Sequence, residues 1–212
     1  DKIEKMLNVA LAFDDGRPLL VHHDMQVVDK DLKPLSHSFW QFSKLKPQAT
    51  SLNRLLMQNN VTGAACMINH ALIEMALPIP CDAMMHDHWL ALIASSFGEI
   101  IPVMEPLIKY RQHGSNQLGA KKQGVLSYLK KGIRKLGESP FAKNQAQAKA
   151  FLNRFYDLLS EENRILLTTF TSLSEASYLK SRYLIIKSRF WKQGWLKNLT
   201  LLIAPYESSP RT

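Results

Sequence analysis

The sequence predicts an α/β fold over residues 1–119, followed by an α-helical region over residues 120–212. Helical and strand-like patterns alternate in the first region, which is typical of a sheet covered by helices. Only helical patterns follow. The charge changes at the same place: residues 1–119 carry 10 Lys and Arg against 12 Asp and Glu, and residues 120–212 carry 17 against 6, a net of +11. We therefore look for an acidic partner of the second region only.

The spacing of apolar residues sets the elements expected in the first region. A stripe at helical spacing predicts a helix over residues 2–13, ended by the turn Asp14-Asp15-Gly16. Residues 36–54 mix aromatic and basic side chains and are expected to form loop and short helix. The other expected elements are strands at 19–24, 60–69, 100–103 and 107–110 and helices at 70–77 and 87–96, with Gly98 as the C-cap of the last helix.

The second region predicts helices near residues 124–136, 141–159, 161–170 and 173–193. Ser172-x-x-Glu175 has the spacing of a capping box, in which both side chains bond the backbone at the start of a helix. We expect it to begin the last of these helices.

The chain lacks the sequence motifs that several classes of enzyme require. The chain has no Walker loop, no Gly-x-Gly-x-x-Gly, no Gly-x-Ser-x-Gly and no His-Glu-x-x-His. No apolar run approaches the roughly 20 residues of a bilayer-spanning helix. Two cysteines, Cys66 and Cys81, are too few for a disulfide framework and fit a reducing cytoplasm.

The densest group of reactive side chains is His86-Asp87-His88-Trp89. Asp87 stands in the first turn of an expected helix, where the helix dipole and backbone N–H groups favour an ionised carboxylate. Such a carboxylate, aimed into a cleft, can take the proton of an attacking hydroxyl as a general base. Spacing alone leaves open a second interpretation, in which Asp87 only caps the helix and the two histidines are solvated.

A second group, Arg111-Gln112-His113-Gly114-Ser115-Asn116, suits an anion, because it offers a guanidinium, an imidazole and a hydroxyl on a loop that Gly114 lets bend tightly. Pyrophosphate with a divalent ion is the ligand that fits it, with His113 able to bind the metal. A polar surface loop is the alternative. His22-His23-Asp24 ends an expected strand, where ligands often bind in open sheets, and a structural role is its alternative.

Taken in order, these segments resemble the middle of bacterial family 2 glycosyltransferases of the rhamnosyltransferase type. The resemblance covers about residues 1–120, and its last two motifs are the most specific. It is carried by Asp1-Lys2-Ile3-Glu4-Lys5, Leu20-Val21-His22-His23-Asp24, Val27-Val28-Asp29, Asn60-Val61-Thr62-Gly63, Pro78-Ile79-Pro80, His86-Asp87-His88-Trp89 and Tyr110-Arg111-Gln112-His113-Gly114-Ser115-Asn116.

The resemblance implies a GT-A fold, of which residues 1–119 form the acceptor-side half. It implies transfer of a sugar, with inversion, from a nucleotide-diphosphate donor to a cell-envelope glycan or lipid-linked acceptor. Rhamnose is one candidate sugar, and the sequence leaves the identity of the sugar open. Asp87 is then the base. Arg111, His113 and Ser115 are implied at the donor pyrophosphate, with His113 at a Mg²⁺ or Mn²⁺ ion. The residues implied at the acceptor are Thr62, Gly63, His86, His88 and Trp89.

Two departures from the family pattern limit what the resemblance implies. The nucleotide-binding strands and the Asp-x-Asp-type metal motif of the family precede the point where this chain starts, so the chain alone is expected to be inactive. His88 also replaces an aromatic residue that is frequent in the family, which leaves the acceptor open.

The end of the basic region is amphipathic. Leu179, Tyr183, Ile186 and Phe190 fall at helical spacing among Lys and Arg residues, and Trp191 and Trp195 follow. Aromatic side chains beside cations suit the interface of an anionic bilayer, which predicts a peripheral protein on the cytoplasmic face of the membrane. The alternative is a helix whose apolar stripe packs on the catalytic domain.

Two rival functions use the same features. A basic nucleic-acid-binding module would use the +11 region and its aromatic residues, although the resemblance predicts no nucleic-acid partner. A metal-dependent hydrolase would use His86, Asp87, His88 and His113.

Overall fold

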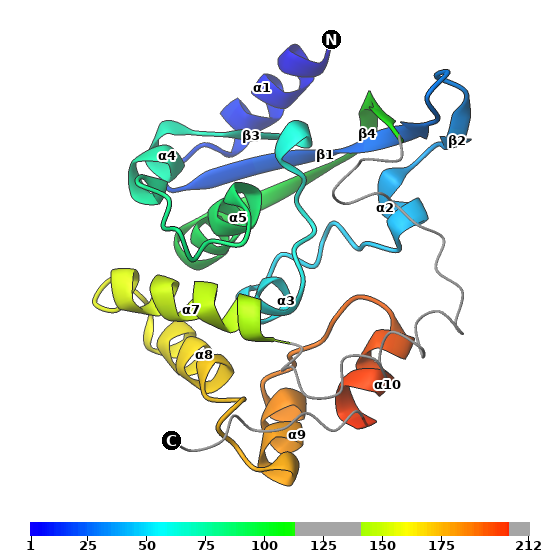
Figure 1. Cartoon of the computed structure of the whole chain (residues 1–212). Coiled ribbons are helices and arrows are strands. Elements are labelled where there is room, and N and C mark those ends of the chain that lie inside the picture. Colours follow the sequence, from blue (N-terminus) through cyan, green and yellow to red (C-terminus); the bar gives the residue numbers. More distant parts are fainter. Residues whose placement is uncertain (113–140, 204–212) are drawn as a thin grey trace. The chain divides into compact units, whose positions relative to one another are not determined.

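A computed structural model describes residues 1–112 and 141–203 (Figure 1). The described residues combine helices with one open mixed sheet, which confirms the expected α/β class. The chain divides into two compact units, each assembled from separate stretches of sequence. In the described residues, the first unit is 1–50, 60–77 and 93–112, and the second is 51–59, 78–92 and 141–203. The expected boundary after residue 119 lies outside the described residues.

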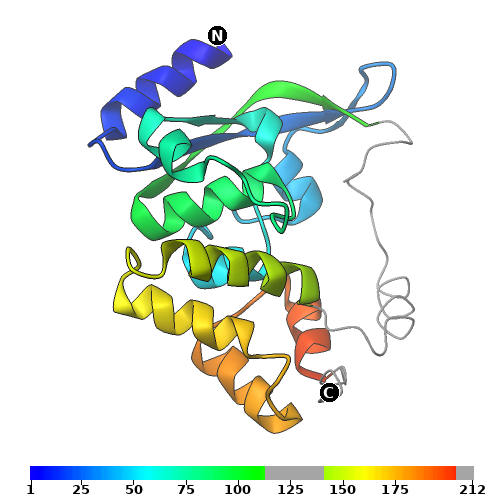
Figure 2. The ribbon, with the colours of Figure 1, turned by 60° about the vertical axis from the view of Figure 1, so that its left-hand side comes forward.

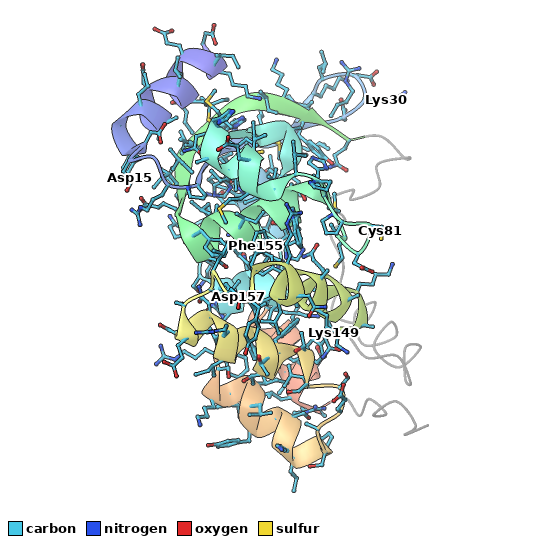
Figure 3. All side chains as sticks on the ribbon, turned by 90° about the vertical axis from the view of Figure 1, so that its left-hand side faces the viewer. Asp15, Lys30, Cys81, Lys149, Phe155 and Asp157 are labelled. Atoms are coloured by element: carbon cyan, nitrogen blue, oxygen red, sulfur yellow. The ribbon has the colours of Figure 1, made fainter. Side chains whose placement is uncertain are left out.

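The sheet of the first unit is built around β1 (Leu19–Val28), which runs between the turns that carry Asp15 and Lys30 (Figure 3). β4 (Glu99–Arg111) lies parallel to β1 along its whole length. Two short strands, β2 (Pro34–Ser36) and β3 (Cys66–Ile68), pair antiparallel with the C-terminal and N-terminal parts of β1. Because β1 is the central strand, nearly all of its residues are buried.

Both long strands exceed their predicted lengths. The strand expected at 19–24 continues to Val28, and the strands expected at 100–103 and 107–110 are one strand. Pro106 does not break it, because the register with β1 shifts on both sides of Asp24, which is paired with Pro106. Such local irregularities accommodate a residue that cannot donate to the ladder.

The helices of the first unit begin at the polar residues that cap them. Asp1 accepts a hydrogen bond from the Ile3 amide at the start of α1 (Lys2–Phe13), which confirms the helix expected at 2–13. Ser38 caps α2 (Phe39–Ser43), and Asn69 caps α4 (His70–Ala76), as expected near 70–77. α1 packs on the first half of β1, and α2 packs on the second half.

One local prediction in this unit was wrong, and a second holds for another reason. The strand expected over 60–69 is only Cys66–Ile68, because the 3₁₀ turn η1 (Gly63–Ala65) occupies the preceding residues. Gly98 directly follows α5, as expected, and its amide donates to the Ala94 carbonyl at 3.0 Å, but it does not adopt the left-handed conformation of a glycine cap. It is required by a close approach instead, since a Cβ at this position would lie 1.8 Å from the Pro18 carbonyl oxygen.

The second unit is helical. Helices α7 and α8 lie side by side in both views (Figures 1 and 2), and the buried rings of Trp89, Phe151 and Phe155 pack together in its core. Its helices are α3 (Leu52–Met57), the first part of α5 (His86–Phe97), α7 (Ala142–Phe155), α8 (Glu161–Thr171), α9 (Tyr178–Lys187) and α10 (Trp195–Ile203). No helix among residues 1–112 and 141–203 is long and apolar enough to cross a membrane.

The prediction of a single helix over residues 173–193 was wrong, because the chain turns twice within that range. Ser172 ends α8, and its hydroxyl donates to the Thr169 carbonyl, so the expected capping box does not form. α9 begins only after Ser177. α10 begins after Gly194, whose backbone is left-handed with φ at +104°. The helix expected at 124–136 lies outside the described residues.

Candidate functional site

Asp87 lies in the first turn of α5, as the sequence predicts. Its side chain is 4% exposed, and its Oδ1 atom accepts a hydrogen bond of 3.1 Å from the side-chain amide of Asn59. The partial positive charge at the helix N-terminus and the amide of Asn59 both stabilise a negative charge on this carboxylate. His86, one residue earlier, is exposed. The site therefore presents a buried carboxylate that the side chain of Asn59 holds in place.

His88 is 3% exposed, and its Nε2 atom lies 2.8 Å from the Leu55 carbonyl oxygen. A carbonyl oxygen can only accept, so Nε2 carries the proton and donates. Burial lowers the pKa of His88, and the bond to Leu55 and the nearby Asp87 oppose this effect. His88 is therefore a neutral imidazole that ties α5 to the end of α3.

Trp89 is fully buried and packs against the second unit's own helices. Its ring lies edge-on to Phe151 at 5.4 Å and 6.0 Å from Phe155, both on α7. Phe155 is labelled in Figure 3. The side chains of Trp89 and His88 are both buried in the second unit. Their contacts fix the position of the N-terminal part of α5, which carries Asp87. Acceptor binding by His86, His88 and Trp89 stays a prediction.

Residues 51–59, which contain α3, connect the other segments of the second unit. Besides the bonds to Asp87 and His88, the Leu56 carbonyl accepts from Asn144 of α7 at 2.7 Å. Arg54 donates to the Trp191 carbonyl at 3.3 Å, and Gln58 Oε1 accepts from the Gln193 amide at 3.0 Å. This 51–59 segment therefore fixes the N-terminus of α5 relative to α7 and to the loop between α9 and α10.

Asn59 is the site residue that the sequence did not identify. It is 28 residues from Asp87, and the resemblance gives it no role. Its neighbour Asn60 is a structural residue of the first unit, where its side-chain amide donates to the carbonyls of Lys46, Pro47 and Ala49. The Asn59-Asn60 pair is the only local signal, and it does not indicate which of the two amides contacts a carboxylate.

The other expected site residues either belong to the first unit or lie outside the described residues. Thr62 precedes η1 and Gly63 begins it, so neither lies on a strand. Arg111 ends β4 beside Val28 of β1 and is exposed. His113 and Ser115 lie outside the described residues. The structure brings together Asp87, His88 and Trp89 in one unit, and the predicted pyrophosphate site stays a prediction.

His22-His23-Asp24 lies in the interior of β1 and not at a strand end, which corrects the predicted position. Oδ1 of Asp24 accepts from the Met25, Phe39 and Trp40 amides at 2.8, 3.0 and 3.2 Å, so this carboxylate anchors the start of α2. Both imidazoles are 1% exposed, and the Nε2 atom of each has no hydrogen-bond partner in the described structure. The three hydrogen bonds of Asp24 support the structural interpretation of the motif.

The predicted metal site depends on His113, which lies outside the described residues. Among residues 1–112 and 141–203, no three His, Cys, Asp or Glu side chains come together in a way that could hold a metal ion. The hydrolase alternative needs His88 and His113 as ligands, and His113 lies outside the described residues. The described residues therefore provide a buried carboxylate that is held by Asn59, and the hydrolase alternative stays a prediction.

Comparison of the chain with family models, with curated proteins and with solved structures finds no match.

Proposed function

We propose that this chain is the acceptor-side part of an inverting glycosyltransferase, in which Asp87 activates the acceptor hydroxyl. The observation that carries the proposal is the buried carboxylate at the N-terminus of α5, held by Asn59 at 3.1 Å. The order of the motifs that resemble family 2 glycosyltransferases supports the same function. The donor is a nucleotide-diphosphate sugar, and the acceptor is a hydroxyl of a cell-envelope glycan or lipid-linked sugar.

In the proposed reaction, Asp87 accepts the proton of the acceptor hydroxyl while that oxygen attacks the anomeric carbon of the donor sugar. The bond from this carbon to the diphosphate oxygen breaks, the configuration inverts, and the nucleoside diphosphate leaves with the bonding electrons. The proton then passes from Asp87 to solvent. General-base catalysis of this kind contributes on the order of 10²- to 10⁴-fold to the rate.

Arg111, His113 and Ser115 are proposed to bind the departing diphosphate. A Mg²⁺ or Mn²⁺ ion would neutralise part of its charge, with His113 as the residue of this chain that would hold it. His113 lies outside the described residues. Asn59, His88 and Trp89 are proposed to position the base through the contacts of α5.

Asp87→Asn tests the proposal in a protein that contains this chain together with a donor-binding half. Asparagine keeps the shape of the side chain and can still accept from Asn59, but it is not a base. Transfer from a radiolabelled nucleotide sugar should fall by about 10²- to 10⁴-fold, with the dissociation constant of the donor unchanged. Asp82→Asn is the matched control, because Asp82 is an exposed carboxylate just before α5. Near-normal transfer by Asp87→Asn would refute the role of the base.

A further inference from the structure

The net positive charge of the described C-terminal residues comes from residues 178–203. Residues 141–177 carry four Lys and Arg against four Asp and Glu, whereas residues 178–203 carry six Lys and Arg and no acid. We call residues 178–203, which comprise α9, α10 and the loop between them, the terminal helix pair. Its cations are Lys180, Arg182, Lys187, Arg189, Lys192 and Lys197.

α9 exposes an apolar stripe beside these cations. Leu179, Tyr183 and Ile186 recur at helical spacing and are exposed, with Leu179 78% exposed. Lys180 and Lys187 are also exposed, and each follows a stripe residue by one position, which places both along the same flank of the stripe. The Lys187 ammonium lies 5.7 Å from the centre of the Tyr183 ring.

α10 exposes a second stripe of the same kind, with Trp195, Leu199 and Ile203 one turn apart and Trp195 72% exposed. Two residues of α9 hold the two helices together. The Arg182 Nε donates to the Leu202 carbonyl at 2.9 Å, and the Tyr178 hydroxyl donates to the same oxygen at 3.1 Å. The helices lie next to each other in Figures 1 and 2.

We propose that the terminal helix pair docks on the surface of an anionic lipid bilayer. Five of its six cations are exposed or half-buried, the sixth being the buried Arg182, and with no acid among them they complement anionic headgroups. Its exposed leucine, isoleucine and tryptophan side chains gain an apolar environment at the acyl boundary. A nucleic acid offers phosphates but no apolar layer for the aliphatic side chains. The terminal helix pair of a second copy would bring the same net charge of +6 and repel the first pair.

The lengths of the helices determine how they would meet the bilayer. α9 has 10 residues and α10 has 9. At about 1.5 Å per residue each spans roughly 15 Å, half of the ~30 Å hydrocarbon core. The helices therefore lie in the plane of the interface, with the stripes facing the lipid. This inference does not depend on the proposed transferase activity.

Vesicle co-sedimentation tests the docking surface with the whole chain. The vesicles are phosphatidylcholine alone, or phosphatidylcholine with about one part in three of phosphatidylglycerol, at physiological ionic strength. The chain should bind the anionic vesicles, should bind phosphatidylcholine vesicles far more weakly, and should be released by high salt. Because the net positive charge of the whole chain also attracts anionic vesicles, the comparison between variants decides the test.

The double variant Lys180→Gln/Lys187→Gln should lower the partition coefficient by about 25-fold, since each cation near the surface contributes about fivefold. Lys143→Gln/Lys149→Gln is the matched control, because it removes the same charge from exposed positions of α7, where Lys149 is labelled in Figure 3. It should retain binding within about twofold. Circular dichroism verifies that both variants are folded.

Tryptophan fluorescence tests insertion of the stripe. Anionic vesicles should shift the emission of the chain to shorter wavelength, and Trp195→Phe should remove most of that shift. Equal losses in the two double variants would overturn the assignment of the surface to α9. Absence of vesicle binding would overturn the proposal. An electrophoretic mobility shift of DNA or RNA at the same salt would then indicate a nucleic-acid partner, and a dimer in analytical ultracentrifugation would indicate a second copy of the chain.

Discussion

Acid should destabilise the first unit through His22, a neutral imidazole buried in β1. Burial is the main reason that the pKa of His22 falls from 6.5 to about 4, and the adjacent His23 adds to it. A hydrogen bond to the Pro47 carbonyl opposes the shift, and the Trp40 ring packs 5.2 Å away. Since Nε2 has no partner among the described residues, an imidazolium would carry a buried donor that bonds nothing there.

The sign and size of the effect follow from proton linkage. The unfolded chain binds the proton near pH 6.5 and the folded chain only near pH 4, so stability is fully present above pH 6.5 and is lost as the pH falls. His22 alone should remove about 2 kcal/mol of unfolding free energy between pH 7 and pH 5, and about 3 kcal/mol below pH 4. Most carboxylates stay ionised down to pH 5, so this interval isolates the histidines.

Urea unfolding followed by circular dichroism at pH 7 and pH 5 measures the loss. His22→Gln can still donate to the Pro47 carbonyl but does not titrate, so its loss should be about 2 kcal/mol smaller than that of the unchanged chain. The contribution of His88 is present in both proteins and cancels. His37→Gln, at an exposed position, should behave like the unchanged chain. Equal losses in His22→Gln and the unchanged chain would refute a buried, neutral His22.

Two further substitutions test packing in the two units. Gly98→Ala should lower the unfolding free energy by about 3 kcal/mol, because its Cβ would lie 1.8 Å from the Pro18 carbonyl oxygen. Gly16→Ala is the control, and in urea denaturation it should lower the unfolding free energy by only about 1 kcal/mol, since Gly16 is left-handed but has open space around it. Equal losses of unfolding free energy in the two variants would contradict the close approach of Gly98 to Pro18. His88→Phe should cost about 2 kcal/mol by leaving the buried Leu55 carbonyl without its donor. His86→Gln, exposed, should stay within about 0.5 kcal/mol of the unchanged chain, and an equally stable His88→Phe would show that the bond contributes nothing.

Helices with clear local signals could be predicted from the sequence, and the break within 173–193 could not. Residues 2–13 carry an apolar stripe and end at a polar turn, and α1 follows them. Between residues 173 and 193 the apolar spacing continues through two turns, because the turn residues Leu173 and Phe190 are themselves fully buried. At Arg189 the backbone becomes left-handed, with φ at +54°, and the helix ends. The apolar spacing of the sequence continues past this residue, so the sequence does not reveal the turn.

Strand lengths and the partner of Asp87 depend on contacts between distant residues. Pro106 reads as a break in isolation, and only pairing with β1 shows how the ladder accommodates it. The position of Asp87 in the first turn of a helix could be predicted, because helix start signals are local. Its bond to Asn59 requires the 51–59 segment to fold against α5, and no spacing rule reports that.

The 51–59 segment links the two proposals within one unit. Asn59 bonds the carboxylate of Asp87, while Arg54 and Gln58 bond the loop between α9 and α10. A bilayer that holds the terminal helix pair would therefore also orient the N-terminus of α5. A lipid-linked acceptor presents its hydroxyl close to the headgroups, so a base held at a fixed height gains from proximity and orientation. The proposals still fail separately, because vesicle binding needs the cations of α9 and not Asp87, whereas transfer to a soluble acceptor needs Asp87 and not those cations.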